Sequence, residues 1–297
     1  MKVLKKILLV FFAILVLSLI GGFFYFKTKF TPPPNYLKVV GISKEVPFRW
    51  VPNGDNLHAA LLLPVKVKGI ESHLYMQLDF GSPITVFYAR SLKSIQPKLL
   101  SLDSLQKKSN QVVLNFNLEE MQISSREFRL LDYGDSVDVE NPSAVNIIGT
   151  IGTDLLEKRV VMLDFKNNNC SFLDSLPGAK LTDFDFEMRK ILFPAKIGNE
   201  ELKLLFDSGT SGFELITSKN EWEKYRTSGE RKVEKGNSWG NILTVFTAPA
   251  NTEIQFGNST LKLSEVTYIE GTSKIQNLLM RFSGMQGMIG NKIFLNH

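Results

Sequence analysis

The feature that most constrains the fold of this chain is an internal repeat. Three short segments of the first half return in the same order in the second half. The pairs are LPVKV at 63–67 and FPAKI at 193–197, QLDFGS at 77–82 and LFDSGT at 205–210, and GTIGTDLL at 149–156 and GMIGNKIF at 287–294. One match of this length is weak, but three in register predict two similar lobes. We place the lobes at residues 37–178 and 179–297.

The lobes are expected to consist of strands. Short apolar runs recur between Gly, Asn, Asp and Ser residues, and several of them alternate apolar and polar positions. The runs are 59–67, 74–78, 112–116, 160–165, 202–206 and 261–269. Helical stretches are short, around 89–94, 153–158 and 218–225. The expected fold class is therefore all-β, with two similar lobes that follow one N-terminal helix.

The N-terminal residues are predicted to form a membrane anchor. Ile7 to Phe26 is a run of 20 residues without a charge, which as a helix spans about 30 Å, the thickness of the hydrocarbon core. Lys2, Lys5 and Lys6 precede it and favour a cytoplasmic N-terminus. A cleaved signal peptide would have an apolar region of about 7–15 residues and a small-residue cleavage site. We therefore expect an uncleaved single-pass anchor at residues 1–29 and a stiff proline-rich linker at 30–36.

The amino-acid composition excludes several kinds of site and partner. Cys170 is the only cysteine, so the chain has no intrachain disulfide and no cysteine-based zinc site. The three histidines stand apart from one another, and we expect neither a metal nor a cofactor. The net charge is +5, but the basic residues are spread among acids rather than clustered. That pattern argues against a nucleic-acid partner.

Each lobe carries an apolar residue followed by Asp-x-Gly-Ser/Thr and, later, by Gly-x-Ile-Gly. The acids are Asp79 and Asp207. Two carboxyl groups held face to face share a proton, and their pKa values split. The ionised member takes a proton from water while the protonated member polarises a carbonyl, so a peptide bond is hydrolysed without metal or covalent intermediate. The glycine lets backbone approach the carboxyls closely. The hydroxyls of Ser82 and Thr210 are expected to bond the outer carboxylate oxygens.

With these motifs the chain resembles the bilobal pepsin-like and retropepsin-like aspartic peptidases, in a bacterial, membrane-anchored form. The resemblance covers nearly all of the chain after the anchor. It implies Asp79 and Asp207 as catalytic residues and a polypeptide as substrate or ligand. It also implies active-site loops formed by Phe80, Gly81, Ser82, Ser208, Gly209 and Thr210, braced by Ile151, Gly152, Ile289 and Gly290.

The sequence departs from the family pattern in three places. The residue between Asp and Gly normally reaches across to the other lobe through a hydroxyl; Ser208 fits this role, whereas Phe80 has no hydroxyl and is expected to pack apolarly. The first-lobe flap, near 107–110, is short and lacks a tyrosine, which leaves Trp239-Gly240 as a possible flap. The second lobe ends without a counterpart of the run at 160–165, so its last strands are expected to be missing.

Two other functions remain open at this point. The chain could be an inactive relative that binds extended peptides in the interlobe cleft. It could also be a structural envelope protein whose lobes serve assembly. The lack of disulfides and the short lobes fit a bacterial envelope, with the main domain periplasmic if the cell is Gram-negative. The sequence predicts no oligomeric state.

Overall fold

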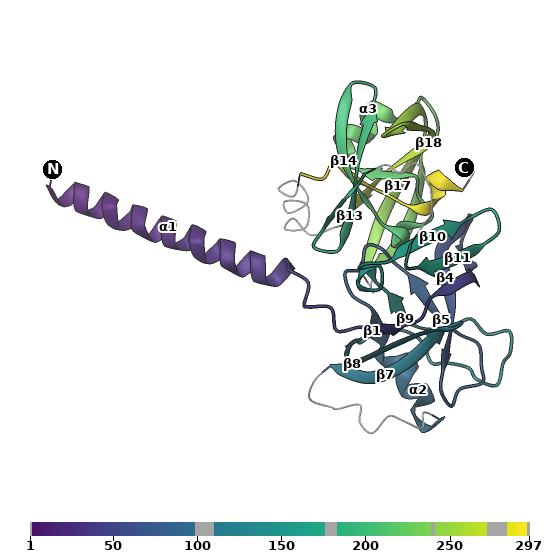
Figure 1. Cartoon of the computed structure of the whole chain (residues 1–297). Helices are drawn as coiled ribbons and strands as arrows, with labels where there is room; N and C mark the ends of the chain where they lie inside the picture. The colour runs from purple at the N-terminus through teal and green to yellow at the C-terminus, as the bar shows by residue number, and fades with distance from the viewer. Residues whose placement is uncertain (1, 99–109, 176–182, 239–240, 272–283, 296–297) are drawn as a thin grey trace. The chain divides into compact units, whose positions relative to one another are not determined.

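The first unit of the molecule is a helix. The computed structural model describes residues 2–98, 110–175, 183–238, 241–271 and 284–295, and it separates residues 1–35 from residues 36–297. Helix α1 (Lys2–Phe30) makes up most of the first unit (Figure 1). Its stretch Lys5–Tyr25 is long and apolar enough to cross a membrane. The expected apolar helix is present and extends a few residues beyond both ends of the uncharged run.

The second unit is built on three β-sheets. The first sheet contains β1 (Lys38–Val40), β3 (Arg49–Asn53), β4 (Asn56–Val67), β5 (Leu74–Leu78), β6 (Val86–Tyr88), β7 (Gln111–Leu118), β8 (Met121–Leu131) and β9 (Asn146–Ile151). The small sheet contains β2 (Ser43–Pro47), β10 (Val160–Asp164) and β11 (Asn169–Leu173). The last sheet contains β12 (Asp185–Glu187), β13 (Lys190–Ile197), β14 (Glu200–Phe206), β15 (Leu215–Thr217), β16 (Lys232–Ser238), β17 (Asn241–Phe256), β18 (Ser259–Glu270) and β19 (Gly287–Ile289).

The two large sheets repeat one strand order. The first runs β8-β6-β9-β5-β4 through its middle, and the last runs β18-β15-β19-β14-β13. The directions also repeat, because β5 pairs with β9 and β14 with β19 in parallel, while β6 with β9 and β15 with β19 are antiparallel. In each sheet a further strand closes the circuit: β7 pairs with β4 and β8, and β17 pairs with β13 and β18 (labels in Figure 1). The repeat in the sequence is thus a repeat in topology.

Helices in the second unit are short, as the sequence predicts. They are α2 (Ala89–Ile95), α3 (Lys219–Tyr225) and the 3₁₀ turns η1 (Gln96–Lys98), η2 (Thr153–Leu155), η3 (Ser208–Thr210) and η4 (Asn291–Phe294). α3 begins where the Ser218 hydroxyl accepts from the N–H of Glu221 at 3.2 Å. A helix was expected at 153–158, but only its first turn forms, as η2. A right-handed helix cannot include Lys158, because the φ angle of this residue is 60°.

The cores follow from strand alternation. Along β7 every second residue is buried, so Val112, Leu114, Phe116 and Leu118 enter the core, while Gln111, Val113 and Asn115 face outward. In the first sheet the rings of Phe87, Phe116 and Phe128 pack with centroids 5.0 to 5.9 Å apart. A second ring cluster joins Phe193, Phe206 and Phe256 of the last sheet to Phe294 of η4. A fully buried ring contributes about 1.5–3 kcal/mol to folding.

The small sheet uses residues from both ends of the first lobe. Its order is β10-β11-β2, which joins Ser43–Pro47 to strands that follow the first large sheet in the chain. Cys170 is fully buried there, and burial raises the pKa of its thiol to about 12. It therefore acts as a small packing residue. Among the described residues, no strand from 185–295 joins this sheet.

Candidate active site

Each of the two candidate acids directly follows a central strand, and a neighbouring strand holds it in place. Asp79 follows β5 and donates its backbone N–H to the Ile151 carbonyl at 3.0 Å. Asp207 follows β14 and donates in the same way to Ile289 at 2.9 Å. Because β9 and β19 run parallel to these strands, each ladder continues one residue past the strand end. The brace expected at these isoleucines is present in both lobes.

Backbone N–H groups hold the carboxyl oxygens. Asp79 Oδ1 accepts from the N–H of Gly81 at 2.8 Å and from that of Ser82 at 3.2 Å. Asp207 Oδ1 accepts from the N–H of Gly209 at 2.8 Å. Each acid is thereby fixed by its own loop, and bonds of this kind to a charged acceptor are stronger than neutral ones.

The role expected for the two loop hydroxyls is wrong. The Ser82 hydroxyl donates to the Ile84 carbonyl at 2.8 Å, and the Thr210 hydroxyl donates to the Asp207 carbonyl at 2.8 Å. A hydroxyl has a single hydrogen, so neither is available for a carboxylate. The physical reason is local: in a tight turn the nearest acceptor for a short side chain is a backbone carbonyl.

The glycines of the two loops lie against the acids of the opposite loop. A Cβ built on Gly81 would come within 2.5 to 2.7 Å of the carboxyl atoms of Asp207. One built on Gly209 would come within 2.7 to 2.9 Å of those of Asp79. Any side chain here would displace a carboxyl. The glycines are therefore required because of the neighbouring lobe, and the two acids come close enough to hydrogen-bond each other.

Burial raises the pKa of both acids. The pKa of Asp207 is raised to about 8, mainly by burial and secondly by the negative charge of Asp79. Asp79 is also raised by burial, while hydrogen bonds from Gly81, Asp207 and Ser82 oppose the rise. Two acids so close behave as one unit that holds a single proton over a wide pH range. The raised pKa values therefore belong to the pair of acids.

Ser208 ties the second loop to the first. Its hydroxyl donates to the Leu78 carbonyl at 2.9 Å and accepts from the N–H of Phe80 at 2.9 Å. The side chain is fully buried. The cross-lobe bond predicted for this serine is therefore confirmed.

Phe80 replaces the second hydroxyl tie with an aromatic contact. Its side chain is only 3% exposed. The ring meets the ring of Phe206 edge to face, with centroids 5.3 Å apart. Phe206 directly precedes Asp207, so the contact again joins the two loops. The apolar packing predicted for Phe80 is confirmed, and edge-to-face pairs add about 0.5–1.5 kcal/mol to burial.

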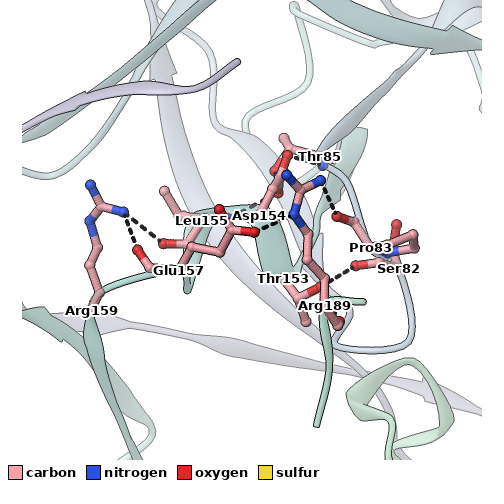
Figure 2. Close-up of polar contacts among 9 residues, drawn as sticks. All are labelled: Ser82, Pro83, Thr85, Thr153, Asp154, Leu155, Glu157, Arg159 and Arg189. Atoms are coloured by element: carbon pink, nitrogen blue, oxygen red, sulfur yellow. Dashed lines mark hydrogen bonds and ion pairs between the residues drawn. The ribbon is translucent and has the colours of Figure 1, made fainter. Parts of the chain in front are cut away.

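A cluster beside the Asp79 loop escaped the sequence analysis (Figure 2). Asp154, which follows the first brace, is 5% exposed and accepts from the N–H and hydroxyl of Thr85 at 2.8 and 2.7 Å. Burial raises its pKa, while the Thr85 bonds and the charge of Arg189 oppose the rise. The position of Asp154 directly after Gly-x-Ile-Gly-Thr could have marked it as a residue of the site. Nothing in the sequence marks Arg189, because it lies far from this motif along the chain.

The possible flap residues are not placed. Trp239 and Gly240 lie outside the described residues, as do 107–109 in the first lobe. β16 and β17 pair on either side of Trp239-Gly240, with Ser238 opposite Asn241. The role of Trp239 and Gly240 as a flap stays a prediction.

A pocket of about 240 Å³ lies beside the second loop. It lies between the tip of the β3–β4 hairpin, at 55–58, and second-lobe residues that include Gly212 and Lys292. An ion pair of 3.1 Å between Asp55 and Lys232 crosses it from one lobe to the other. Neither Asp79 nor Asp207 lines this pocket. It is therefore separate from the acid pair.

Comparisons with known proteins give distant likenesses among solved structures. No family model matches the sequence, and no curated protein matches it. Among solved structures, the crystal structure of an aspartic proteinase from Irpex lacteus matches with a TM-score of 0.40 and 10% sequence identity, over 87% of this chain and 92% of that chain. The repeated strand order and the paired acids of this chain, rather than that likeness, support the proposal that follows.

Proposed function

We propose that the chain is an aspartic-type endopeptidase in which Asp79 and Asp207 activate water. The observation that carries the proposal is the half-buried pair of acids, one from each of two duplicated loops, each of which lies against the glycine of the opposite loop. Their backbone N–H donors orient the pair without a metal. Paired carboxyls with raised and split pKa values are the arrangement that shares one proton between an acid and a base.

The chemistry follows from that single proton. Asp79, ionised, takes a proton from a water molecule as the water oxygen attacks the scissile carbonyl carbon. Asp207 gives its proton to the carbonyl oxygen, which produces a neutral tetrahedral diol. When the C–N bond breaks, Asp79 returns its proton to the leaving nitrogen, and a diol hydroxyl returns one to Asp207. The pair ends in the protonation state in which it began.

The substrate class and location extend the proposal. Two acids that come from tight turns of two different lobes suit an extended polypeptide as substrate. We place α1 in a membrane with the N-terminal lysines in the cytoplasm and residues 36–297 outside it. Protease added to cells with a permeabilised outer layer should then remove residues 36–297 while the inner membrane is intact. Cleavage only after lysis of the inner membrane contradicts this topology.

The decisive test is hydrolysis that depends on both acids. The full chain, purified in detergent, is incubated with an unfolded protein substrate, and new amino termini are counted over time. Asp79→Asn and Asp207→Asn should each reduce cleavage to background, and the double variant should be no worse, because the acids act as one unit. Asp132→Asn removes an acid whose side chain is 90% exposed and serves as the matched control. Unchanged cleavage in either single variant contradicts the assignment.

A transition-state mimic separates a peptidase from a peptide binder. A statine-containing peptide replaces the attacked carbonyl and water with a stable hydroxyl, so a peptidase should be inhibited by it at low concentration. Binding of the mimic without any hydrolysis by the parent would indicate the inactive peptide-binding alternative. No binding and no hydrolysis would rule out both.

A further inference from the structure

A two-residue turn between β12 and β13 adopts an unfavourable backbone. Glu187 pairs with Lys190, which leaves Met188 and Arg189 as the turn residues. Their φ angles are 49° and 60°. Hairpin turns with two positive φ values favour Asn and Gly, and other residues there are strained. Such strain persists only where surrounding contacts enforce it, and it concentrates at functional positions.

The contacts that enforce it come from Arg189. This residue is 6% exposed, and its side chain leaves the second-lobe hairpin to enter the first lobe (Figure 2). Its Nε donates to Glu157 Oε1 at 2.6 Å and its Nη1 donates to the Pro83 carbonyl at 3.2 Å. Its backbone carbonyl accepts from the Thr153 hydroxyl at 2.6 Å. A guanidinium is suited to this because its donors lie in a fixed plane.

Those partners surround the Asp79 loop. Pro83 ends that loop, and Thr153 directly follows the brace that anchors it. At the start of the loop, the Ser208 hydroxyl bonds Leu78 and Phe80. The second lobe therefore holds the first loop at both ends, by a serine at one and an arginine at the other.

We propose that Arg189 is a positioning residue that fixes the Asp79 loop relative to Asp207 from the opposite lobe. Its contact compensates for the hydroxyl tie that Phe80 does not provide. The acid pair depends on this register because a shared proton requires the carboxyls to stay within hydrogen-bond reach. Arg189 acts through Pro83 and the brace and does not touch the reacting atoms. The inference deepens the proposed peptidase function and rests on it for its kinetic part only.

The main variant is Arg189→Lys in the full chain. Lysine keeps the charge opposite Glu157, but its single ammonium lacks the planar fork that reaches Glu157 and Pro83 together. The matched control is Arg159→Lys, because Arg159 Nη1 bonds only carbonyls of its own segment, Leu155 at 3.2 Å and Glu157 at 3.1 Å. Glu157→Gln is a second variant that weakens the hold on Arg189 and leaves the arginine itself in place.

The first measurement does not need activity. Carbon-13 labelled aspartate carboxyls are titrated by NMR, with Asp79→Asn and Asp207→Asn to assign the signals. In Arg189→Lys the two titrations should move closer together and toward the ordinary carboxyl range, because separated acids no longer couple. Arg159→Lys should leave them unchanged. Glu157→Gln should show the same direction as Arg189→Lys with a smaller shift, and it tests the proposal if Arg189→Lys does not fold.

The second measurement is kinetic. Misplacing a catalytic group by about 1 Å costs about 10²-fold in rate, so kcat for Arg189→Lys should fall by about that factor while KM changes little. If the parent hydrolyses nothing, the proposed function fails, but the carboxyl titration still decides the positioning role. If Arg189→Lys matches Arg159→Lys in both the titration and kcat, the proposal is wrong and Arg189 is only a structural residue.

Discussion

The Asp79 and Asp207 loops repeat one motif, but their supports differ. Both loops share the cross-lobe bonds of Ser208. The Asp207 loop is otherwise held within its own lobe: the Ser211 hydroxyl donates to the Ser208 carbonyl at 2.6 Å and accepts from the Asn291 side chain at 2.7 Å. The Asp79 loop is held by its own lobe where the Ser82 carbonyl accepts from the N–H of Thr153 at 2.9 Å, and also by Arg189 of the other lobe.

This difference shows how a duplicated site becomes asymmetric without losing its chemistry. The parts that touch the acids are the same in both lobes: the brace, the backbone donors and the glycine that faces the other acid. The parts one layer further out have diverged, since Thr153 and Asp154 stand where the second lobe has Asn291 and Lys292. The brace, the backbone donors and the glycine must keep their geometry because they contact the carboxyls. The residues behind them can vary, provided that they hold the loop in place.

The largest expected effect tests the symmetry of the inner parts. Gly81→Ala and Gly209→Ala each place a Cβ against the carboxyl of the opposite lobe, so both should reduce the hydrolysis rate by about 10²-fold or more. Gly22→Ala, where a Cβ meets nothing within 4 Å, is the control. A large loss in one variant and none in the other would show that the two glycines are not equivalent.

The next effect tests the two residues between Asp and Gly. Phe80→Thr removes a buried ring and should lower the free energy of unfolding by about 2–4 kcal/mol through the cavity it leaves. Ser208→Ala leaves buried partners at Leu78 and Phe80 and should cost about 1–3 kcal/mol. Chemical denaturation of the two single variants and the double variant measures both terms and their coupling. A Phe80→Thr chain as stable as the parent would exclude a packing role.

A third effect compares the acids through pH. The pKa of Asp207 is raised in the folded chain to about 8, whereas an unfolded carboxyl titrates near 4. Between these values the folded state binds more protons than the unfolded state, so stability falls as pH rises. Asp207→Asn removes that slope and should gain stability relative to the parent from pH 4 to pH 8, by more than about 1.4 kcal/mol.

Unfolding in urea at several pH values measures this effect. The matched variant is Asp132→Asn, whose exposed carboxyl should leave the pH slope of the parent unchanged. Parallel pH curves for the parent and Asp207→Asn would contradict a raised pKa at this acid.

The smallest effect concerns the loop hydroxyls. Because Ser82 and Thr210 donate to backbone carbonyls, Ser82→Ala and Thr210→Val should each cost about 1 kcal/mol or less in stability. Neither should move the pH dependence of hydrolysis. If the pH profile of hydrolysis shifts in either variant, the hydroxyl does contact a carboxylate, as the sequence predicted.

The sequence by itself determined the repeated inner parts of the site. Asp79, Asp207 and their glycines were predicted because residue type and order along each lobe specify them, whereas the bracing role of the Ile-Gly segments was predicted from the resemblance to the aspartic peptidases. The strand runs and the apolar helix were also predicted from the residues themselves, since alternation and the length of an apolar run are local properties. The cross-lobe role of the Ser208 hydroxyl was predicted from the same resemblance, and its partners are the backbone groups of Leu78 and Phe80.

Only the tertiary structure decided which atoms meet between the lobes. Nothing in the sequence places Arg189 beside Pro83, because the two are separated by 106 positions and have no counterpart in the repeat. The sequence also could not predict that the hydroxyls of Ser82 and Thr210 donate to backbone carbonyls, since a carbonyl and a carboxylate compete as acceptors within each short loop. The Cα of Gly81 lies against the carboxyl of Asp207, while its N–H bonds its own acid, and the sequence did not predict the contact with Asp207. Contacts across an interface depend on how two folded surfaces dock, and local pattern does not encode that docking.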